Sequence, residues 1–289
     1  AVPSAPRPAP SDDRRRPLLE PGDPPAEATR RTLRFAGPDP LARVGLGTPA
    51  AAGIAFDLDD GRVLWRRHPR RTRSIASLTK VMTALLVVER TRPRDVVRVP
   101  AAAEQVRGSR MGFLPPGRRV RVETLLHGLL MSSGNDAAVA LAAHVAGSQR
   151  RFVARMNARA RALGLACTRF ATPHGLSAQD RSCPADLGEL AVRAMDERRI
   201  AAIARKRSVR VRIGRLGLRW LATTNPLLQR GDPGVLGLKT GWTPRAGRCL
   251  IAVVRQGGRR RVVVLLGSGD PGGAARRLLR AAGRVRTGA

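Results

Sequence analysis

The sequence contains no tyrosine, and phenylalanine and tryptophan together make up only 3% of its 289 residues. No run of 18 or more apolar residues occurs, so we expect no transmembrane helix. A basic stretch followed by an apolar one is also missing at Ala1, so the sequence shows no secretory signal. A signal or anchor that preceded Ala1 and was removed is compatible with this start.

Acidic residues are scarce, and lysine is scarcer still. The chain has 54 basic and 21 acidic residues, a formal net charge of +33, yet lysine occurs only as Lys80, Lys206 and Lys239. This charge allows association with an anionic cell wall or membrane surface. The arginines, however, are spread over every segment, which indicates a compositional preference. Because aromatic stacking motifs and zinc-finger spacing are missing, we expect no nucleic-acid partner.

Metal-binding patterns are missing as well. Cys167, Cys183 and Cys249 form no CxxC pair and have no metal-ligand spacing with the four histidines. We therefore expect neither a metal nor another cofactor. If the protein is exported, Cys167 and Cys183 can form a disulfide that leaves Cys249 free, but three small buried thiols are an equally good interpretation.

The chain begins with a proline-rich stretch and continues as a long region of mixed composition. Residues 1–48 hold nearly half of the 22 prolines and show no helical or strand period, which predicts a disordered, solvated tether. With 43% hydrophobic residues overall, the chain can bury a real core. We therefore expect residues 49–289 to form one catalytic domain.

Apolar periodicity predicts strands at both ends of this domain and helices between them. AGIAFDL and RVLWRR flank Asp59-Asp60-Gly61, which predicts a hairpin, and GVLGLKTGW, RCLIAVVRQ and RRVVVLLGSG predict further strands. Helices are expected over 77–90, over most of 120–205 and in the final PGGAARRLLRAAGRV segment. The expected fold is α/β (α+β), with one antiparallel sheet built from both chain ends, flanking helices and a largely helical middle lobe.

Ser77 and Lys80 lie three residues apart on the helix expected at 77–90, hence on one of its faces. A serine nucleophile needs a base, and an amine this close can take its proton. Arginine at position 80 would stay protonated, whereas the pKa of a lysine can be lowered at a partly buried cationic site. Since the chain has only three lysines, a lysine at position 80 indicates that the chemistry of this position requires one.

Two further motifs carry polar groups at expected turns. Ser133 and Asn135, within SSGND, lie between two apolar helical stretches, where they can enter a cleft or serve as an ordinary helix N-cap. Lys239-Thr240-Gly241 ends a strand, where a cation beside a hydroxyl suits a carboxylate and Gly241 allows a substrate backbone to approach. A charged strand end followed by a turn is the alternative interpretation.

Together these motifs, SxxK, SxN and KTG in this order, resemble those of the serine penicillin-binding enzymes. FDLDDGRVL, SIASLTKVMTALL, LLHGLLMSSGNDAAVALAAHVAG, MNARARALGL, TPHGL and LGLKTGWTPRAG look like the low-molecular-weight D-alanyl-D-alanine carboxypeptidases over about residues 50–268. The resemblance implies a serine β-lactamase/D,D-peptidase-like fold and extracytoplasmic action. It also implies peptidoglycan stem peptides ending in D-Ala-D-Ala as substrates, and β-lactams as acylating inhibitors.

The resemblance also assigns residues to catalysis and substrate binding. They are Ser77 as nucleophile, Lys80 as base, Ser133 as proton relay hydrogen-bonded toward Lys80 or Lys239, Asn135 for the substrate amide, Lys239 and Thr240 for the terminal carboxylate, Gly241 beside the substrate backbone, and Trp242, whose backbone amide joins that of Ser77 in an oxyanion hole. One position departs from the pattern: Thr224 stands where some relatives carry an arginine that helps bind the carboxylate.

Three other functions stay open on the sequence alone. A D,D-endopeptidase that cuts cross-linked wall would share all of these residues. A class A-like β-lactamase shares the motif set but needs a glutamate after SxN, and none occurs between Ala137 and Gly188. A non-catalytic wall-binding module is disfavoured by the intact motif residues.

Overall fold

The computed structural model describes residues 33–35, 37, 39–112, 114–214 and 217–285. Most of the predicted tether, residues 1–32, lies outside this range. Its described end packs on the domain, because Leu33 and Leu41 are buried and the Leu33 N–H donates to Glu189 Oε1 at 2.9 Å. Burial of these two leucines removes apolar surface from water and favours this packing. The domain boundary at residue 49 stays a prediction.

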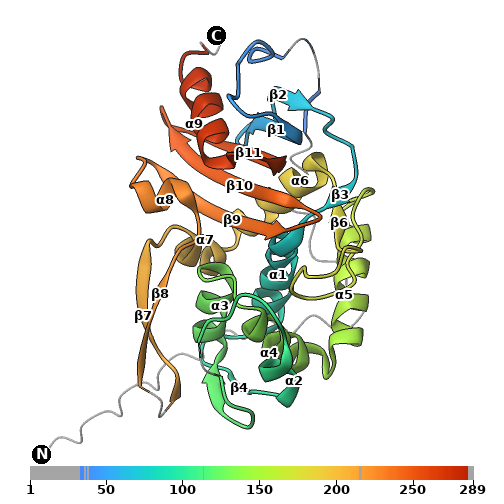
Figure 1. Cartoon of the computed structure of the whole chain (residues 1–289), viewed down its shortest axis with the longest axis vertical. Helices are drawn as coiled ribbons and strands as arrows, with labels where there is room; N and C mark the ends of the chain where they lie inside the picture. Colours follow the sequence, from blue (N-terminus) through green and yellow to red (C-terminus); the bar gives the residue numbers. More distant parts are fainter. Residues whose placement is uncertain (1–32, 36, 38, 113, 215–216, 286–289) are drawn as a thin grey trace, which may run out of the picture.

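A five-stranded antiparallel sheet in the order β2-β1-β11-β10-β9 joins the two ends of the described chain (Figure 1). Its strands are β1 (Ala50–Asp57), β2 (Val63–Arg67), β9 (Val235–Thr243), β10 (Gly247–Gln256) and β11 (Arg259–Ser268). In the center, β1 pairs with β11 from Ala50 opposite Ser268 to Asp57 opposite Arg261. The expected sheet from both chain ends is therefore confirmed.

Strand residues alternate between two hydrophobic layers, one on each face of the sheet. Leu250 and Ala252 of β10 belong to the layer under α9 (Pro271–Ala282), while Ile251 and Val253 belong to the larger core shared with the helices of the middle lobe. This period of two is what a strand buried on both faces requires. The sheet is thus covered on both sides, and β9 remains as an edge strand.

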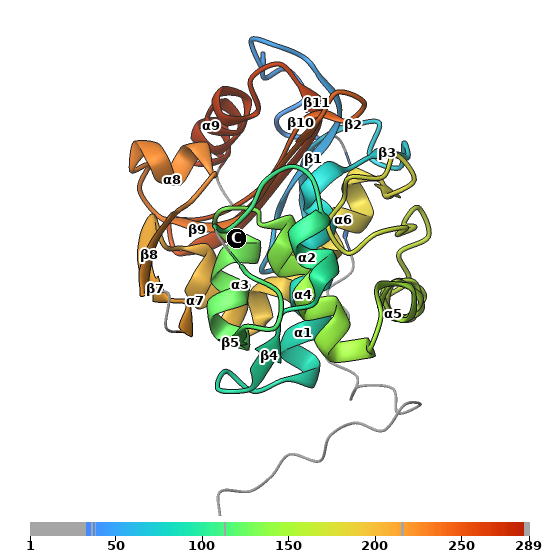
Figure 2. The ribbon, with the colours of Figure 1, turned by 60° about the horizontal axis from the view of Figure 1, so that its bottom comes forward.

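The helices between the two halves of the sheet form the predicted middle lobe. They are α1 (Lys80–Arg90), α2 (Ala101–Gln105), α3 (Val122–Leu130), α4 (Asn135–Ala146), α5 (Gln149–Ala162), α6 (Pro184–Asp196) and α7 (Arg198–Ala204), with α8 (Pro226–Arg230) following before β9. Figure 2 turns this lobe toward the viewer, with α2, α3 and α4 in front of the sheet. Helix α1 lies inside the lobe, since eight of its eleven residues are buried.

Three short strand pairs were not expected from the sequence. They are β3 (Arg73–Ser74) with β6 (Arg181–Ser182), β4 (Val96–Arg98) with β5 (Arg119–Arg121), and β7 (Ser208–Arg212) with β8 (Leu218–Ala222). The predicted start of the helix at Ser77 also differs, because Ala76–Thr79 form a 3₁₀ turn, η1, and the α-helix begins at Lys80.

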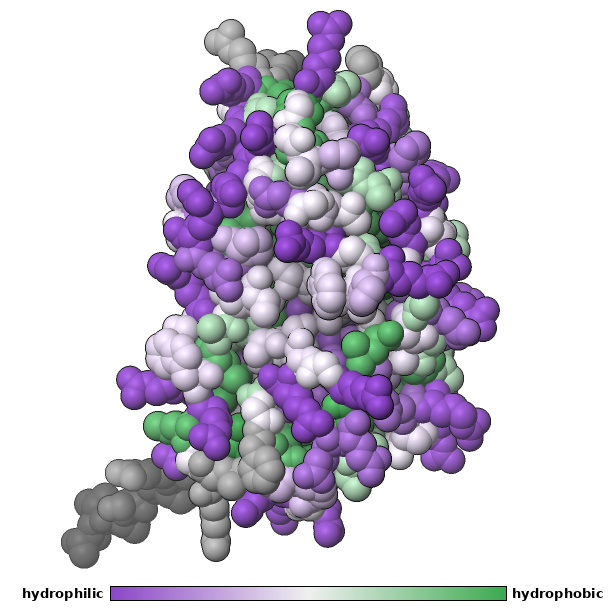
Figure 3. All heavy atoms as spheres, in the orientation of Figure 1, coloured by the Kyte–Doolittle hydropathy of each residue, from purple (hydrophilic) through white to green (hydrophobic). Residues whose placement is uncertain are grey.

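Within the described ranges, no helix is both long and apolar enough to cross a membrane. The final helix α9 buries Ala274, Ala275, Leu278 and Leu279 against the sheet, so its apolar face closes the fold. Figure 3 shows hydrophilic side chains over most of the visible face, in keeping with arginines spread along the whole chain.

Candidate active site

Ser77 and Lys80 meet where η1 turns into α1. The Lys80 ammonium donates to Ser77 Oγ at 2.8 Å, and Lys80 is 0% exposed while Ser77 is half-buried. Ala76, just before Ser77, has a φ of 48°, a left-handed conformation that is costly for a residue with a Cβ. The turn thus presents the serine hydroxyl at the surface while its partner amine stays inside the protein.

The remaining donors of Lys80 are used by two other elements. Lys80 Nζ donates to Asn135 Oδ1 at 2.7 Å and to the His174 carbonyl oxygen at 2.6 Å. Asn135 is the first residue of α4, and His174 lies in the segment between α5 and α6. Three acceptors from three parts of the chain therefore hold the amine in one place beside Ser77.

Burial is the main cause that lowers the pKa of Lys80 well below its usual value. The positive charge of Lys239 lowers this pKa further, while the carboxylates of Asp180 and Asp136 raise it. A lowered pKa increases the fraction of neutral amine near neutral pH. Only the neutral amine can accept the proton of the serine hydroxyl.

Asn135 is engaged at both ends of its side chain. While Oδ1 accepts from Lys80, Nδ2 donates to the Arg107 carbonyl oxygen at 2.7 Å, and the residue is 1% exposed. The sequence assigned Asn135 to the substrate amide. In the structure these two contacts fix the Asn135 side chain beside the Lys80 amine.

Ser133 lies on the turn between α3 and α4 with a φ of 60° and is 6% exposed. The expected hydrogen bond of Ser133 to Lys80 or Lys239 does not occur among the described residues. Lys80 donates to three other acceptors, and Lys239 donates to the Thr240 carbonyl oxygen. The N-cap alternative also differs from the structure: the cap of α4 is Gly134, without a side-chain hydrogen bond. Ser133 is thus on the expected turn, with its hydroxyl bonded to neither lysine.

The KTG motif lies on the edge strand β9, close to η1. A Cβ atom built at Gly241 would lie 3.0 Å from the Ser77 backbone nitrogen and 3.1 Å from the Ile75 carbonyl oxygen. Such separations are tighter than ordinary contacts, so a side chain at this position would press on the backbone around Ser77. Gly241 therefore brings the KTG edge and Ser77 together.

Lys239 is 1% exposed and donates to the Thr240 carbonyl oxygen at 2.9 Å. Burial lowers the pKa of Lys239 to about 7. The Thr240 hydroxyl is 2.6 Å from that of Thr224. Lys239 and Thr240 on β9, together with Thr224 from the segment between β8 and α8, are thus the groups available here for a carboxylate. Trp242 follows them and is 64% exposed.

Two groups near Lys80 were not identified from the sequence as part of the site. One is the main-chain carbonyl of His174, whose own ring is neutral because burial and Lys80 lower its pKa to about 4. The other is Asp180, whose side chain accepts from Ala171 N, Thr172 N and Thr172 Oγ1. The TPHGL sequence was a signal for this segment, but it did not show that a carbonyl would face the base.

Replacing Gly241 by alanine should slow acylation of Ser77 by about tenfold or more, because the new methyl group presses on the backbone at Ser77 and misplaces the nucleophile. The measurement is the rate of labelling by a fluorescent penicillin. Gly45→Ala is the matched control, since a Cβ there meets nothing within 4 Å. Equal labelling rates for both variants would contradict the contact between β9 and η1 at Gly241.

Comparisons with known proteins match this fold and these motifs. The family model described as D-alanyl-D-alanine carboxypeptidase matches residues 45–269. The chain is 33% identical over 243 residues to the D-alanyl-D-alanine carboxypeptidase DacF of Bacillus subtilis, covering 82% of this chain and 62% of that protein. It is 35% identical over 228 residues to a D-alanyl-D-alanine endopeptidase of Pseudomonas aeruginosa, covering 76% of this chain and 72% of that protein.

Among solved structures, the D-alanyl-D-alanine carboxypeptidase of Mycobacterium tuberculosis H37Rv superposes with a TM-score of 0.78 at 31% sequence identity. That alignment covers 88% of this chain and 96% of the solved one. The chain spans between 54% and 62% of the length of three curated carboxypeptidases that it matches. The β-lactamase/D,D-peptidase-like fold expected from the motifs is confirmed.

Proposed function

Because the chain belongs to the D-alanyl-D-alanine carboxypeptidase family, we propose that it removes the terminal D-alanine from peptidoglycan stem peptides through an acyl-enzyme on Ser77. The observation that carries the proposal is the 2.8 Å hydrogen bond between buried Lys80 Nζ and Ser77 Oγ. A neutral amine at this distance can take the proton as the hydroxyl attacks. β-Lactams acylate the same serine.

In the proposed reaction, Ser77 Oγ bonds to the carbonyl carbon of the penultimate D-alanine and Lys80 takes the hydroxyl proton. The peptide C–N bond then breaks, and the leaving amine receives a proton through Ser133. Water hydrolyses the resulting ester and restores the free serine. The backbone amides of Ser77 and Trp242 stabilise the oxyanion, where the loss of one donor typically costs about 10² to 10³ in rate.

Lys239 and Thr240 bind the terminal carboxylate of the substrate in this proposal. The charged Lys239 supplies a cation, and the hydroxyl pair of Thr224 and Thr240 supplies hydrogen bonds. Asn135 keeps its assignment to the substrate amide, with the additional task of orienting Lys80. Gly241 leaves room for the substrate backbone along the β9 edge.

Two assays test this function together. One measures release of D-alanine from a diacetyl-L-Lys-D-Ala-D-Ala peptide, and the other measures covalent labelling by penicillin. We expect D-alanine release together with one labelled serine per chain. If penicillin labels the protein but no D-alanine is released, the carboxypeptidase proposal fails. If neither is seen, the catalytic proposal fails in favour of a wall-binding module.

A D,D-endopeptidase is a second candidate, favoured by the similarity to the Pseudomonas aeruginosa protein of that name. Both reactions would use the same serine and the same base. Cleavage of cross-linked muropeptide dimers, compared with D-alanine release from monomers, distinguishes them. We expect monomers to be the better substrate, and a preference for dimers would reverse this assignment.

A β-lactamase is disfavoured by the carboxylates near the nucleophile. Asp180, a buried carboxylate whose charge acts on Lys80, already accepts from Ala171 N, Thr172 N and Thr172 Oγ1. It is therefore poorly placed to activate water against a penicilloyl ester. We expect the penicilloyl-enzyme to persist, and rapid turnover of penicillin would support a β-lactamase instead.

The pH dependence of substrate binding should report on Lys239. With its pKa at about 7, Lys239 is charged below this pH and neutral above it. Carboxylate binding therefore weakens as the pH rises, and we expect KM for the peptide to increase above pH 7 by up to about tenfold per pH unit. Arginine stays protonated, so in Lys239→Arg the KM should be flat up to pH 9. A flat KM in the wild type would contradict this role.

We also propose that the protein acts outside the cytoplasm, where cell-wall peptide is found, as a secreted, periplasmic or wall- or membrane-associated enzyme. The net charge of +33 supports association with an anionic cell wall or membrane surface. The residues that precede Leu33, where the chain begins to pack on the domain, would serve as its tether.

A further inference from the structure

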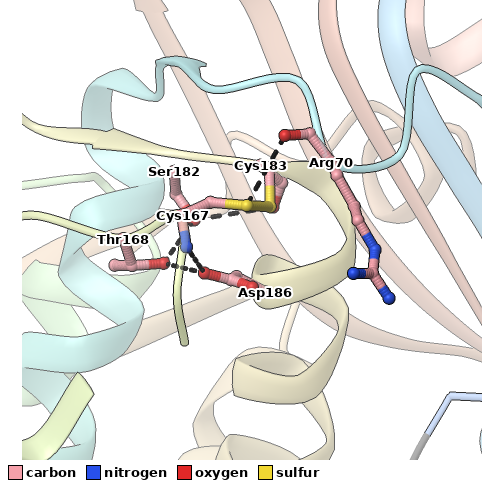
Figure 4. The surroundings of a disulfide bond; sticks show 6 residues. All are labelled: Arg70, Cys167, Thr168, Ser182, Cys183 and Asp186. Carbon is pink, nitrogen blue, oxygen red and sulfur yellow. Dashed lines mark hydrogen bonds between the residues drawn. A yellow bond between two sulfur atoms is a disulfide. The ribbon is translucent and has the colours of Figure 1, made fainter. Parts of the chain in front are cut away.

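A disulfide joins Cys167 to Cys183, with their Cα atoms 5.6 Å apart (Figure 4). Cys249 is a buried free thiol. This selects the first of the two interpretations that the sequence left open. Cys183 is the N-cap residue of α6, and Cys167 follows α5. Next to the bond, Asp186 Oδ2 accepts from the Cys167 N–H and from Thr168 Oγ1, each at 2.7 Å.

The disulfide closes the base of a loop, residues 168–182, that lies against the catalytic helix. The His174 carbonyl of this loop accepts from Lys80 at 2.6 Å, and the Pro173 carbonyl accepts from Thr83 Oγ1 at 2.6 Å. Both acceptors are main-chain oxygens. Their positions therefore depend on the path of the loop backbone and not on a particular side chain.

The same loop also touches the turn that carries the nucleophile. The Ile75 N–H donates to the Asp180 carbonyl at 3.2 Å, and Ser74 Oγ donates to the Ala178 carbonyl at 3.0 Å. Gly175, with a φ of 90°, runs so close to Ala76 that a Cβ would collide with the Ala76 carbonyl oxygen. The loop is therefore in contact with residues on both sides of Ser77 and with its base.

We propose that the Cys167–Cys183 disulfide is a positioning element for catalysis, which holds loop 168–182 over Lys80 so that the oxidised protein acylates rapidly and the reduced protein slowly. Apart from the two residues of β6, the loop contains no helix or strand. A covalent link at its base limits the open conformations that such a loop can reach. A disulfide of this kind persists in the oxidising environment that the proposed extracytoplasmic action implies.

Opening the loop should change the charge state of Lys80. The charged groups that face Lys80 are Lys239 on β9, Asp136 on α4 and Asp180 in the loop itself, and the neutral ring of His174 is also in the loop. Burial is the largest influence on the pKa of Lys80 and lowers it. Water admitted by an open loop therefore raises this pKa, and the smaller opposing effect of losing Asp180 does not cancel it. Less neutral amine remains at pH 7.

The test rests on the proposed function and measures the penicillin acylation rate from pH 5 to 10. It uses the full chain carrying Cys249→Ala, which removes the free thiol, before and after reduction by a water-soluble phosphine and alkylation. We expect the rate at pH 7 to fall about tenfold on reduction, and the midpoint of its rise with pH to move up by about one unit. The variant Cys167→Ser/Cys183→Ser should behave like the reduced protein without any reductant.

Equal rates and equal midpoints in the oxidised and reduced forms would overturn the proposal. Loss of near-ultraviolet circular dichroism in both the reduced protein and the double variant would overturn it as well, because the bond would then serve only stability. If the oxidised protein is not acylated at all, the proposed acyl-enzyme function fails. If the oxidised and reduced forms are acylated at the same rate, only the proposed role of the disulfide fails.

Discussion

Ser77→Ala is expected to lower the rate of D-alanine release by about 10⁴ to 10⁶-fold, because the variant has no hydroxyl to form the acyl-enzyme. The fold should be unaffected, since Ser77 is half-buried on the surface of η1 and its hydroxyl contacts Lys80. Covalent labelling by penicillin should disappear in the same variant. The measurement is D-alanine release under saturating peptide, read alongside the labelling assay.

Ser148→Ala is the matched control for this substitution. Ser148 caps α5 through the Arg151 N–H at 3.2 Å, far along the chain from the motif residues. Loss of this cap should cost about 1 kcal/mol of stability without changing D-alanine release. If Ser77→Ala retained more than a hundredth of the wild-type rate, a different nucleophile would be required.

Lys80→Arg should lower the acylation rate by about 10³-fold or more while leaving a positive charge at the same position. A guanidinium stays protonated at every pH that the protein tolerates, so it cannot accept the Ser77 proton. Its fork is also larger than the space set by Asn135 Oδ1 and the His174 carbonyl, at 2.7 and 2.6 Å from the Lys80 nitrogen. The loss should not be recovered at high pH.

Lys206→Arg provides the control for this change. Lys206 lies outside the motifs, with its nitrogen 3.2 Å from His127 Nε2. Arginine there should leave penicillin labelling within about twofold of wild type, because Lys206 is half-buried and the substitution keeps its positive charge. An active Lys80→Arg variant would show that Lys80 is an electrostatic group and not the base.

The strands of the five-stranded sheet could be predicted from local sequence patterns. The hairpin of β1 and β2 followed from apolar runs around Asp59-Asp60-Gly61, and Gly61 has the positive φ of 75° that such a turn needs. The hairpin of β7 and β8 was missed because its residues are mostly exposed or half-buried, so the apolar alternation that marks a strand is weak there.

Only part of the geometry of the candidate site could be predicted from the sequence. The spacing predicted that Ser77 and Lys80 lie side by side, and Lys80 Nζ is 2.8 Å from Ser77 Oγ although Ser77 lies in η1 and Lys80 begins α1. The hydrogen bond between Asn135 and Lys80 depends on how α4 packs beside α1. The sequence does not show this packing, because the Asn135 side chain can donate or accept toward many partners. The contact of the His174 carbonyl with Lys80 could not be predicted either, because every residue has a main-chain carbonyl.

Contacts between segments that lie far apart in the sequence could not be predicted. That Gly241 faces the Ser77 amide depends on the packing of the sheet against the helical lobe, and no local pattern encodes it. The pairing of Cys167 with Cys183 likewise depends on the approach of two Cα atoms to 5.6 Å, so the spacing alone left two interpretations open.

The central claim is that Ser77 forms the acyl-enzyme, and mass spectrometry of penicillin-treated protein tests it most directly. Trypsin releases the peptide Ser74–Lys80, which contains both Ser77 and Lys80. We expect one penicilloyl group per chain, located at Ser77 by fragmentation and slow to hydrolyse, in a preparation that also releases D-alanine. A stable adduct on any other residue, or D-alanine release with Ser77 unmodified and penicillin without effect, would contradict the account.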